Sequence, residues 1–171
     1  MISAPGEILG HVLDFRILGP LEVSNETGLL RLGGRKQRAA LVLLLLEPGR
    51  VVSRSRLIDA LWGERPPRTA TASLQRLVFQ LRQTLGPDIL ETKPPGYRLR
   101  VRPGELDVDR FRVLVESARG AEPTECATKL RHALALWRGP ALADFTSEPF
   151  AQPHISRLQE LRLSAVAMLR G

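Results

Sequence analysis

The chain has 171 residues, 43% hydrophobic and 25% charged, which is typical of a folded globular protein and excludes a disordered one. Its longest apolar run, residues 39–46, is too short to cross a membrane, and its first residues lack the basic cluster and apolar stretch of a secretion signal. One cysteine, Cys126, excludes an internal disulfide and a thiolate zinc site, so we expect a cytoplasmic protein.

The net charge of +7 lies entirely in the first part of the chain. Residues 1–104 contain 16 Lys and Arg against 9 Asp and Glu, whereas residues 105–171 contain 9 of each. This local excess favours a polyanionic partner for the first part, although a merely solvated basic surface would have the same charge. Most of the basic residues are arginines, which suit bidentate contacts with phosphate and guanine, but a GC-rich genome gives the same bias.

The first elements predicted are the strands of a small antiparallel sheet. Apolar residues alternate with polar ones over residues 13–17 and again over residues 21–23, with a Gly-Pro turn between the two stretches. A turn at residues 25–28 then leads to a third strand expected around Leu30 and Leu32. The sheet therefore precedes any helix.

Two helices and a short strand are expected next. Residues 35–47 follow two glycines and stop at Pro48, and the second half of this helix is apolar all round, as in a central buried helix. A short strand at residues 51–52 follows. Ser53 is then placed to cap a second helix, which ends at Gly63.

A third helix, residues 69–85, combines one apolar stripe with one polar face. The polar face carries Ala72, Ser73, Gln75, Arg76, Phe79, Gln80, Arg82 and Gln83. These side chains suit the edges of DNA bases and include no acid that would repel phosphate, although an ordinary solvated helix face has a similar composition. Phe79 either packs on a neighbour or contacts a thymine methyl group or a sugar, and the sequence does not choose between the two.

Two extended stretches, residues 89–92 and 97–101, complete the first part. The segment Lys93-Pro94-Pro95-Gly96 joins them into a hairpin with a basic, proline-stiffened tip. Sheet, helix, strand, helix, helix and basic hairpin is the order of a winged helix-turn-helix. In that fold the second helix of the motif enters the major groove, where all four base pairs can be distinguished.

The remaining residues, 105–171, are expected to form antiparallel helices of the tetratricopeptide-like kind. These helices are predicted over residues 109–119, from a cap at Thr124 to Trp137, and from Pro153 onward. Their expected core consists of Phe111, Leu114, Leu130, Leu134, Trp137, Leu158 and Leu161. If further helices are missing, a stripe at Leu161, Ala165 and Leu169 would be exposed.

The predicted fold class is therefore an α+β winged helix-turn-helix followed by an all-α tetratricopeptide-like helical domain. Its expected divisions are a flexible leader over residues 1–11, a DNA-binding domain over 12–104 and a helical domain over 105–171. Trp62 and Trp137 are interpreted as core residues because each lies on an apolar helix stripe. Cys126 is interpreted as a small structural residue.

The segments LGPLEV, LGGRKQRAALVLLLLEPGRVVSRSRLIDALWG, SLQRLVFQLRQTLG and TKPPGYRLRV resemble a known DNA-binding domain. It is that of the Streptomyces antibiotic regulatory protein (SARP) family, an OmpR/PhoB-type winged helix that works without the receiver domain of two-component regulators. LDVDRFRVLVESARG and LRHALALWRGPALADF continue the resemblance into that family's bacterial transcriptional activation domain. That domain normally has more helices, so we expect a truncated chain or the front part of a larger regulator.

The resemblance implies a transcriptional activator of secondary-metabolite (antibiotic) biosynthesis genes. Such a protein would bind direct repeats of double-stranded DNA at promoters as a homodimer or as side-by-side protomers, and would recruit RNA polymerase through its sigma factor and other subunits. The bases would be contacted by Ala72, Gln75, Arg76 and Gln80. The DNA backbone would be contacted by Arg54, Arg68, Thr69, Ser73, Arg82, Lys93 and Arg98.

A different class of function stays open. The chain could instead be the N-terminal part of a larger signalling-ATPase regulator whose winged helix serves mainly protein contacts. The acid-free polar helix face and the basic hairpin favour the DNA-binding interpretation.

No catalytic or metal-binding constellation stands out in the sequence. His11, His132 and His154 are scattered without neighbours at ligand spacing, and neither a phosphate-binding glycine loop nor a nucleophile-elbow motif occurs. We therefore expect neither an enzyme nor a cofactor-dependent protein, and we expect it to associate with the nucleoid.

Overall fold

The computed structural model describes residues 12–171, so the leader expected over residues 1–11 lies outside the described residues. The first part contains β1 (Asp14–Arg16), β2 (Glu22–Asn25), β3 (Gly28–Leu29), α1 (Arg35–Leu45), β4 (Val51–Ser53), α2 (Arg54–Trp62), α3 (Ala70–Leu85), β5 (Leu90–Lys93) and β6 (Gly96–Leu99). The second part contains α4 (Asp107–Ala118), α5 (Pro123–Ala135), the 3₁₀ turn η1 (Ala143–Phe145) and α6 (Gln152–Arg170). The predicted winged helix followed by a helical domain is confirmed.

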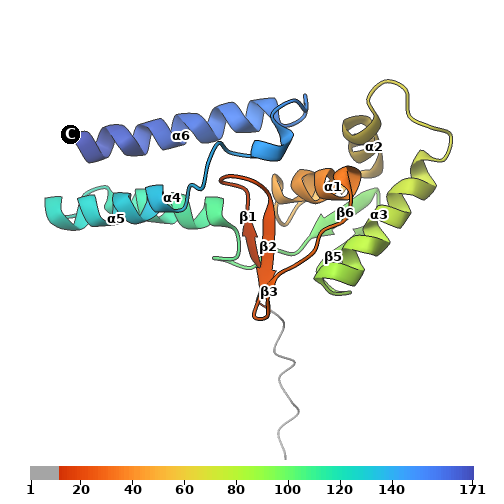
Figure 1. Cartoon of the computed structure of the whole chain (residues 1–171), viewed down its shortest axis with the longest axis horizontal. Coiled ribbons are helices and arrows are strands. Elements are labelled where there is room, and N and C mark those ends of the chain that lie inside the picture. The colour runs from red at the N-terminus through yellow and green to blue at the C-terminus, as the bar shows by residue number, and fades with distance from the viewer. Residues whose placement is uncertain (1–11) are drawn as a thin grey trace, which may run out of the picture.

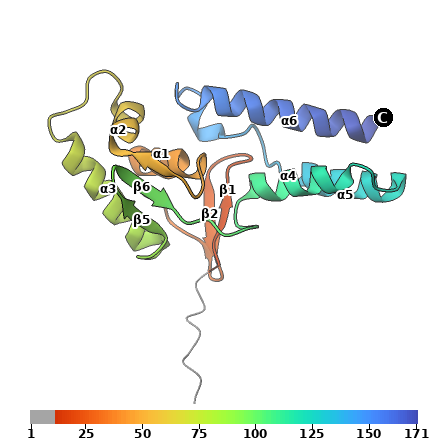
Figure 2. The ribbon, with the colours of Figure 1, turned by 180° about the vertical axis from the view of Figure 1, so that it is seen from behind.

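The sheet β1–β3 lies in the middle of the molecule. Figure 1 shows α1–α3 with the β5–β6 hairpin on one side of it and α4–α6 on the other, and the view from behind in Figure 2 agrees. The helix α3 therefore lies at the end of the molecule that is remote from α4–α6.

The first sheet is antiparallel, with β2 between β1 and β3 and with Phe15 opposite Val23. The third strand comes earlier than the prediction around Leu30 and Leu32, because β3 pairs with β2 only through Gly28 and Leu29. One further bond runs from the Leu30 N–H to the Val23 carbonyl at 2.8 Å. Beyond it the chain leaves the sheet toward α1, so Leu32 packs on the core outside any strand.

Helix α1 is the buried centre of the winged helix, as its all-apolar second half predicts. Residues 39–45 are all buried, and α1 packs against both α2 and α3. The predicted cap of α2 is present, since the Arg56 N–H donates to the Ser53 Oγ at 3.1 Å. The bounds of α2 and α3 lie within one residue of the prediction.

The hairpin of β5 and β6 joins β4 to form a second sheet in the order β4-β6-β5. This wing packs closely on β4, because a Cβ atom at Gly96 would lie only 2.7 Å from the Ser53 Cα. A real Cβ atom does not come so near to backbone, so the tip of the wing needs glycine at this position.

The helices of the second part begin at points that differ from the prediction. Helix α4 starts at Asp107, two residues early, because Leu106 is its extended N-cap. The N-cap of α5 is Glu122, so the prediction of Thr124 was wrong: Pro123 occupies the first helical position, which suits its fixed φ. Because α5 ends at Ala135, Trp137 lies beyond the helix.

The expected core of the second part is buried or half-buried throughout. The Trp137 ring meets the Phe111 ring edge-to-face, with centroids 5.6 Å apart. The expectation of an exposed stripe on α6 was wrong, because α6 packs against α5 and Ala165 is fully buried. The large apolar side chain that α6 does expose is Leu163, at 67%.

Two carboxylates join the two parts of the molecule. The segment before α4 lies along β1, where the Phe15 N–H donates to the Glu105 carbonyl at 2.7 Å. The Glu105 carboxylate accepts from the Leu13 N–H at 3.1 Å, and the Asp107 carboxylate accepts from the N–H groups of Ile17 and Leu18 at 2.9–3.0 Å. Asp107 is 1% exposed, and this burial raises its pKa, while the bonds from Ile17 and Leu18 act in the opposite direction.

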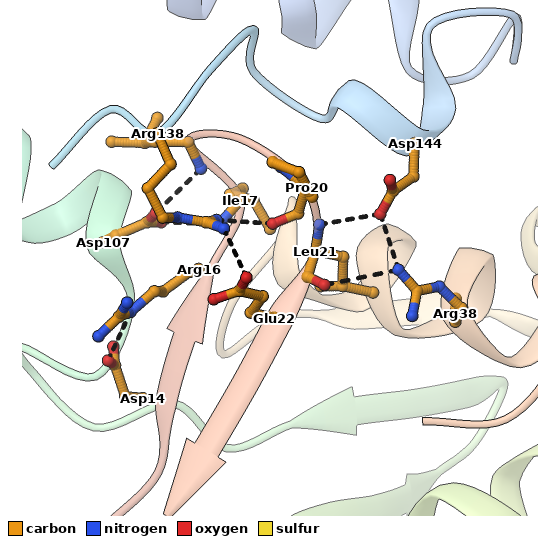
Figure 3. A network of polar contacts seen from close by, with 11 residues as sticks. Asp14, Arg16, Ile17, Pro20, Leu21, Glu22, Arg38, Asp107, Arg138 and Asp144 are labelled. Atoms are coloured by element: carbon orange, nitrogen blue, oxygen red, sulfur yellow. Dashed lines mark hydrogen bonds and ion pairs between the residues drawn. The ribbon is translucent and has the colours of Figure 1, made fainter. Parts of the chain in front are cut away.

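A second polar cluster surrounds the turn between β1 and β2 (Figure 3). Arg138 donates to the Pro20 carbonyl at 2.6 Å and pairs with Glu22 at 3.2 Å. On the other side, Asp144 accepts from the Leu21 N–H at 3.0 Å and pairs with Arg38 at 2.7 Å. The helical part is thus hydrogen-bonded to the sheet at two places.

Candidate nucleic-acid interface

The polar face of α3 points into solvent. Leu74, Val78 and Leu81 are buried on the opposite side of the helix, whereas Gln75 and Arg76 are exposed. Arg76 forms no hydrogen bond or ion pair with any residue of the described range 12–171. Its guanidinium is therefore available to a partner molecule.

The four predicted base-contact residues share this outward side. Ala72 is exposed beside Gln75 and Arg76, and Gln80 is half-buried one turn further along, as the spacing of three or four residues places them. Phe79 is 60% exposed, which argues against packing on a neighbour, one of the two alternatives that the sequence left open. Helix α3 contains no acidic residue, so nothing on this face repels a polyanion.

Three residues predicted to contact the DNA backbone lie at the start of α3. Arg68 and Thr69 are exposed, and Ser73 is half-buried one turn later. Thr69 is the N-cap residue, but its side chain forms no capping hydrogen bond. The positive end of the helix dipole makes such a turn suitable for a phosphate group.

Arg82 is hydrogen-bonded within the protein. Its Nε donates to the Leu90 carbonyl at 2.8 Å, and its Nη2 donates to the Thr92 hydroxyl at 2.9 Å. These bonds join α3 to β5 of the wing, a role that the sequence did not reveal because the partners lie in another element.

Lys93 and Arg98, the two basic residues of the wing strands, differ in whether they have a partner within the protein. Lys93 is exposed at the tip and forms no hydrogen bond or ion pair within the described range. Arg98 instead donates to the Glu91 carboxylate at 2.9 and 2.5 Å. The hydrogen bond from Arg98 lowers the pKa of Glu91, and Arg100 adds to this effect from 3.4 Å.

Arg54 lies where α2 meets the wing. The Arg54 guanidinium is 5.7 Å from the centre of the Tyr97 ring, and the backbone N–H of Arg54 donates to the Pro95 carbonyl at 3.1 Å. The Nε atom of Arg54 is buried without a hydrogen-bond partner. The ring contact with Tyr97 was not predicted, since nothing in the local sequence pairs these two residues.

Comparison with known proteins connects both parts of this geometry to transcription. Residues 31–99 match the family model described as transcriptional regulatory protein, C terminal, and residues 106–170 match the bacterial transcriptional activator domain. Regulatory protein AfsR of Streptomyces griseus is 38% identical over 155 residues, covering 88% of this chain and 16% of AfsR. Regulatory protein DnrI of Streptomyces peucetius is 34% identical over 169 residues, covering 90% of this chain and 62% of DnrI.

A solved structure has the same arrangement. Mycobacterium tuberculosis EmbR, in complex with a low-affinity phosphopeptide, superposes with a TM-score of 0.84 at 35% identity, over 91% of this chain and 44% of that chain. The chain belongs to the SARP family of transcription regulators. It spans less than two thirds of the length of each of these relatives.

The described part of this SARP-family chain lacks two features that would point to other functions. Over residues 12–171, no group of three His, Cys, Asp or Glu side chains is placed to hold a metal ion. In the same range no helix is both long enough and apolar enough to span a bilayer. Trp62 is half-buried, with the Lys36 ammonium 5.4 Å from its ring centre, and Cys126 is partly buried against the core.

Proposed function

We propose that this SARP-family regulator binds double-stranded DNA sequence-specifically and activates genes of secondary-metabolite (antibiotic) biosynthesis. The observation that carries the proposal is the outward face of α3, where Gln75, Arg76 and Phe79 are exposed on a helix without acids. A helix of this kind fits the major groove, and arginine and glutamine recognise guanine and adenine there through paired hydrogen bonds. The protein acts in this proposal by binding and not by catalysis.

Phosphate contacts would set affinity and orientation, while base contacts would set the sequence. Arg68 and Thr69 at the start of α3 and Lys93 at the wing tip are exposed cationic and polar groups suited to phosphate. Arg82 and Arg98 are bonded internally, so we assign them first to the shape of the site. Each would reach phosphate only through a guanidinium nitrogen left free by those bonds.

The helical part would make protein contacts. It has no net charge, and it lies away from α3, so we assign to it contacts between side-by-side protomers on direct repeats and recruitment of RNA polymerase through its sigma factor. The match of residues 106–170 to the bacterial transcriptional activator domain supports this assignment. We keep 12–104 and 105–171 as the proposed division, with residues 105–107 hydrogen-bonded to β1.

A salt titration of the 171-residue chain on duplex DNA tests DNA binding. The plot of log K against log salt should fall with a slope of about −2 or steeper per protomer, since each phosphate neutralised by Arg68 or Lys93 contributes about −0.9. Lys93→Ala should make the slope shallower by about one unit, equally for all DNA sequences. The matched control is Lys129→Ala on α5, which pairs with Glu125 at 2.6 Å and should leave the slope unchanged.

Two results would count against these assignments. An unchanged slope for Lys93→Ala would remove the wing contact. A nearly flat slope for the unaltered chain would favour the alternative, in which the winged helix of a larger signalling-ATPase regulator serves mainly protein contacts.

A further inference from the structure

A cavity of about 540 Å³ lies between the winged helix and the helical part. Its walls come from the end of α1 with the turn after it (residues 45–50), the start of α4 (106–112) and the first half of α6 (154–161). This volume lies within the range of pockets that hold small organic molecules, roughly 300–1,000 Å³. The proposed DNA-binding residues do not line it.

The apolar lining of the cavity comes from both parts of the molecule. It consists of Ile17, Leu45, Leu46, Leu106, Val108, Leu158 and Leu161. Ile17, Leu45 and Leu106 are at most 2% exposed and lie behind the cavity surface, whereas Leu46 and Leu161 are half-buried and provide its accessible apolar surface. An apolar group placed against Leu46 and Leu161 would be partly removed from water.

The charged side chains that line the cavity differ in whether they have a partner within the protein. The Glu47 carboxylate is engaged by Arg56 at 2.7 Å, and the Asp109 carboxylate lies 3.9 Å from Arg112. Arg50 also lines the cavity, and its side chain forms no hydrogen bond or ion pair within the described range 12–171.

Arg157, on the α6 side of the cavity, also lacks an internal partner. It is exposed and forms no ion pair or hydrogen bond with residues 12–171. His154 stands one turn before it. Burial, with Arg56 and Arg157 acting in the same direction and Glu47 against it, lowers the pKa of His154. The guanidinium groups of Arg50 and Arg157, which have no partner among residues 12–171, therefore lie beside the apolar lining of the cavity.

We propose that this cavity binds a small amphipathic organic anion, with its apolar body against Leu46 and Leu161 and its anionic group held by Arg50 and Arg157. Arginine is suited to this task because its planar donors match the oxygens of carboxylate, phosphate and sulfonate groups. Since the walls belong to both parts, an occupant also stabilises their arrangement relative to each other. The proposal does not depend on DNA binding.

Two matched fluorescent probes test it: the anion 8-anilinonaphthalene-1-sulfonate and its neutral analogue N-phenyl-1-naphthylamine, which lacks the sulfonate. Titrated with the 171-residue chain, the anionic probe should saturate at one site per chain. Arg157→Gln and Arg50→Gln should each weaken the anionic probe about three- to tenfold, while changing the neutral probe by less than about twofold. Both arginines are exposed and unpartnered, so neither variant should alter the thermal melting temperature.

Two control variants make the result specific. Arg131→Gln removes an exposed arginine of α5 that does not line the cavity, and should leave both probes unchanged. Val113→Ser alters a neighbouring apolar groove on α4, lined also by Val101 and Leu114, and should likewise have no effect. This groove shares Pro48, Asp109 and Arg112 with the cavity, but Val113 lines the groove alone.

Three outcomes would overturn the proposal: Arg50→Gln and Arg157→Gln chains that bind the anionic probe as tightly as the unaltered chain, binding without saturation, or loss of binding with Val113→Ser. Failure of DNA binding in the salt titration would leave this proposal unaffected, because the probes report on the cavity alone.

Discussion

Asp107→Ala is expected to lower the free energy of unfolding by about 2–4 kcal/mol. The Asp107 carboxylate is the acceptor for the backbone N–H groups of Ile17 and Leu18, which are both buried. A buried donor left without an acceptor costs about 1–3 kcal/mol, and the alanine variant leaves two such donors. Urea denaturation followed by circular dichroism measures the change.

The matched control for this variant is Asp109→Ala, two residues along the same helix. The Asp109 side chain is partly exposed, and its ion pair with Arg112 is long at 3.9 Å and therefore weak. Its removal should change the free energy of unfolding by less than about 0.5 kcal/mol. If the two variants lose equal stability, Asp107 does not hold the two parts together in the way described.

The raised pKa of Asp107 determines how the loss of stability in Asp107→Ala changes with pH. Because burial raises the pKa above its ordinary value, the folded chain binds this proton more tightly than the unfolded chain does. The contribution of Asp107 to stability is therefore greatest in acid and decreases as the pH rises from the ordinary aspartate value through the raised one. The difference in stability between Asp107→Ala and the unaltered chain should widen on acidification over that interval.

Arg76→Ala is expected to weaken binding to the preferred DNA sequence by about 1–3 kcal/mol, which corresponds to roughly 5- to 150-fold. The Arg76 guanidinium is exposed on the outward face of α3 and has no partner in the described range, so its removal disturbs no internal contact. The loss should be confined to one or two base positions, where the variant becomes tolerant of other bases. Competition binding with single-base variants of the preferred site measures both quantities.

The control is Arg131→Ala, which removes an exposed arginine of α5 far from α3 in sequence and should leave DNA affinity unchanged. If Arg76→Ala weakens binding equally for every sequence, Arg76 contacts phosphate and the assignment to a base is wrong.

Much of the winged helix could be predicted from the sequence because its signals are local. The apolar period of α3 separates buried Leu74 and Val78 from exposed Arg76, and the Ser53 cap of α2 is visible as a residue type at a helix start. Thr124 was assigned wrongly for a local reason too, because the preference of Pro123 for the first helical position moved the start of α5.

The contacts that join distant segments could not be predicted in this way. Asp107 and Glu105 look like ordinary surface acids at the start of a helix, yet their partners are backbone groups about ninety residues earlier in the chain. The same limit applies to Arg82 and Arg98, which belong to the expected interface by residue type but are held by Leu90 and Glu91. Which cations remain free for DNA depends on tertiary structure.

We propose that α3 reads a DNA sequence, and selection from a pool of random duplexes tests this role most directly. With the folded 171-residue chain, repeated rounds of capture and sequencing should enrich one short motif, present as two copies in the same orientation about one helical turn apart. Recovery of no motif, from a chain whose circular dichroism shows it to be folded, would contradict the account.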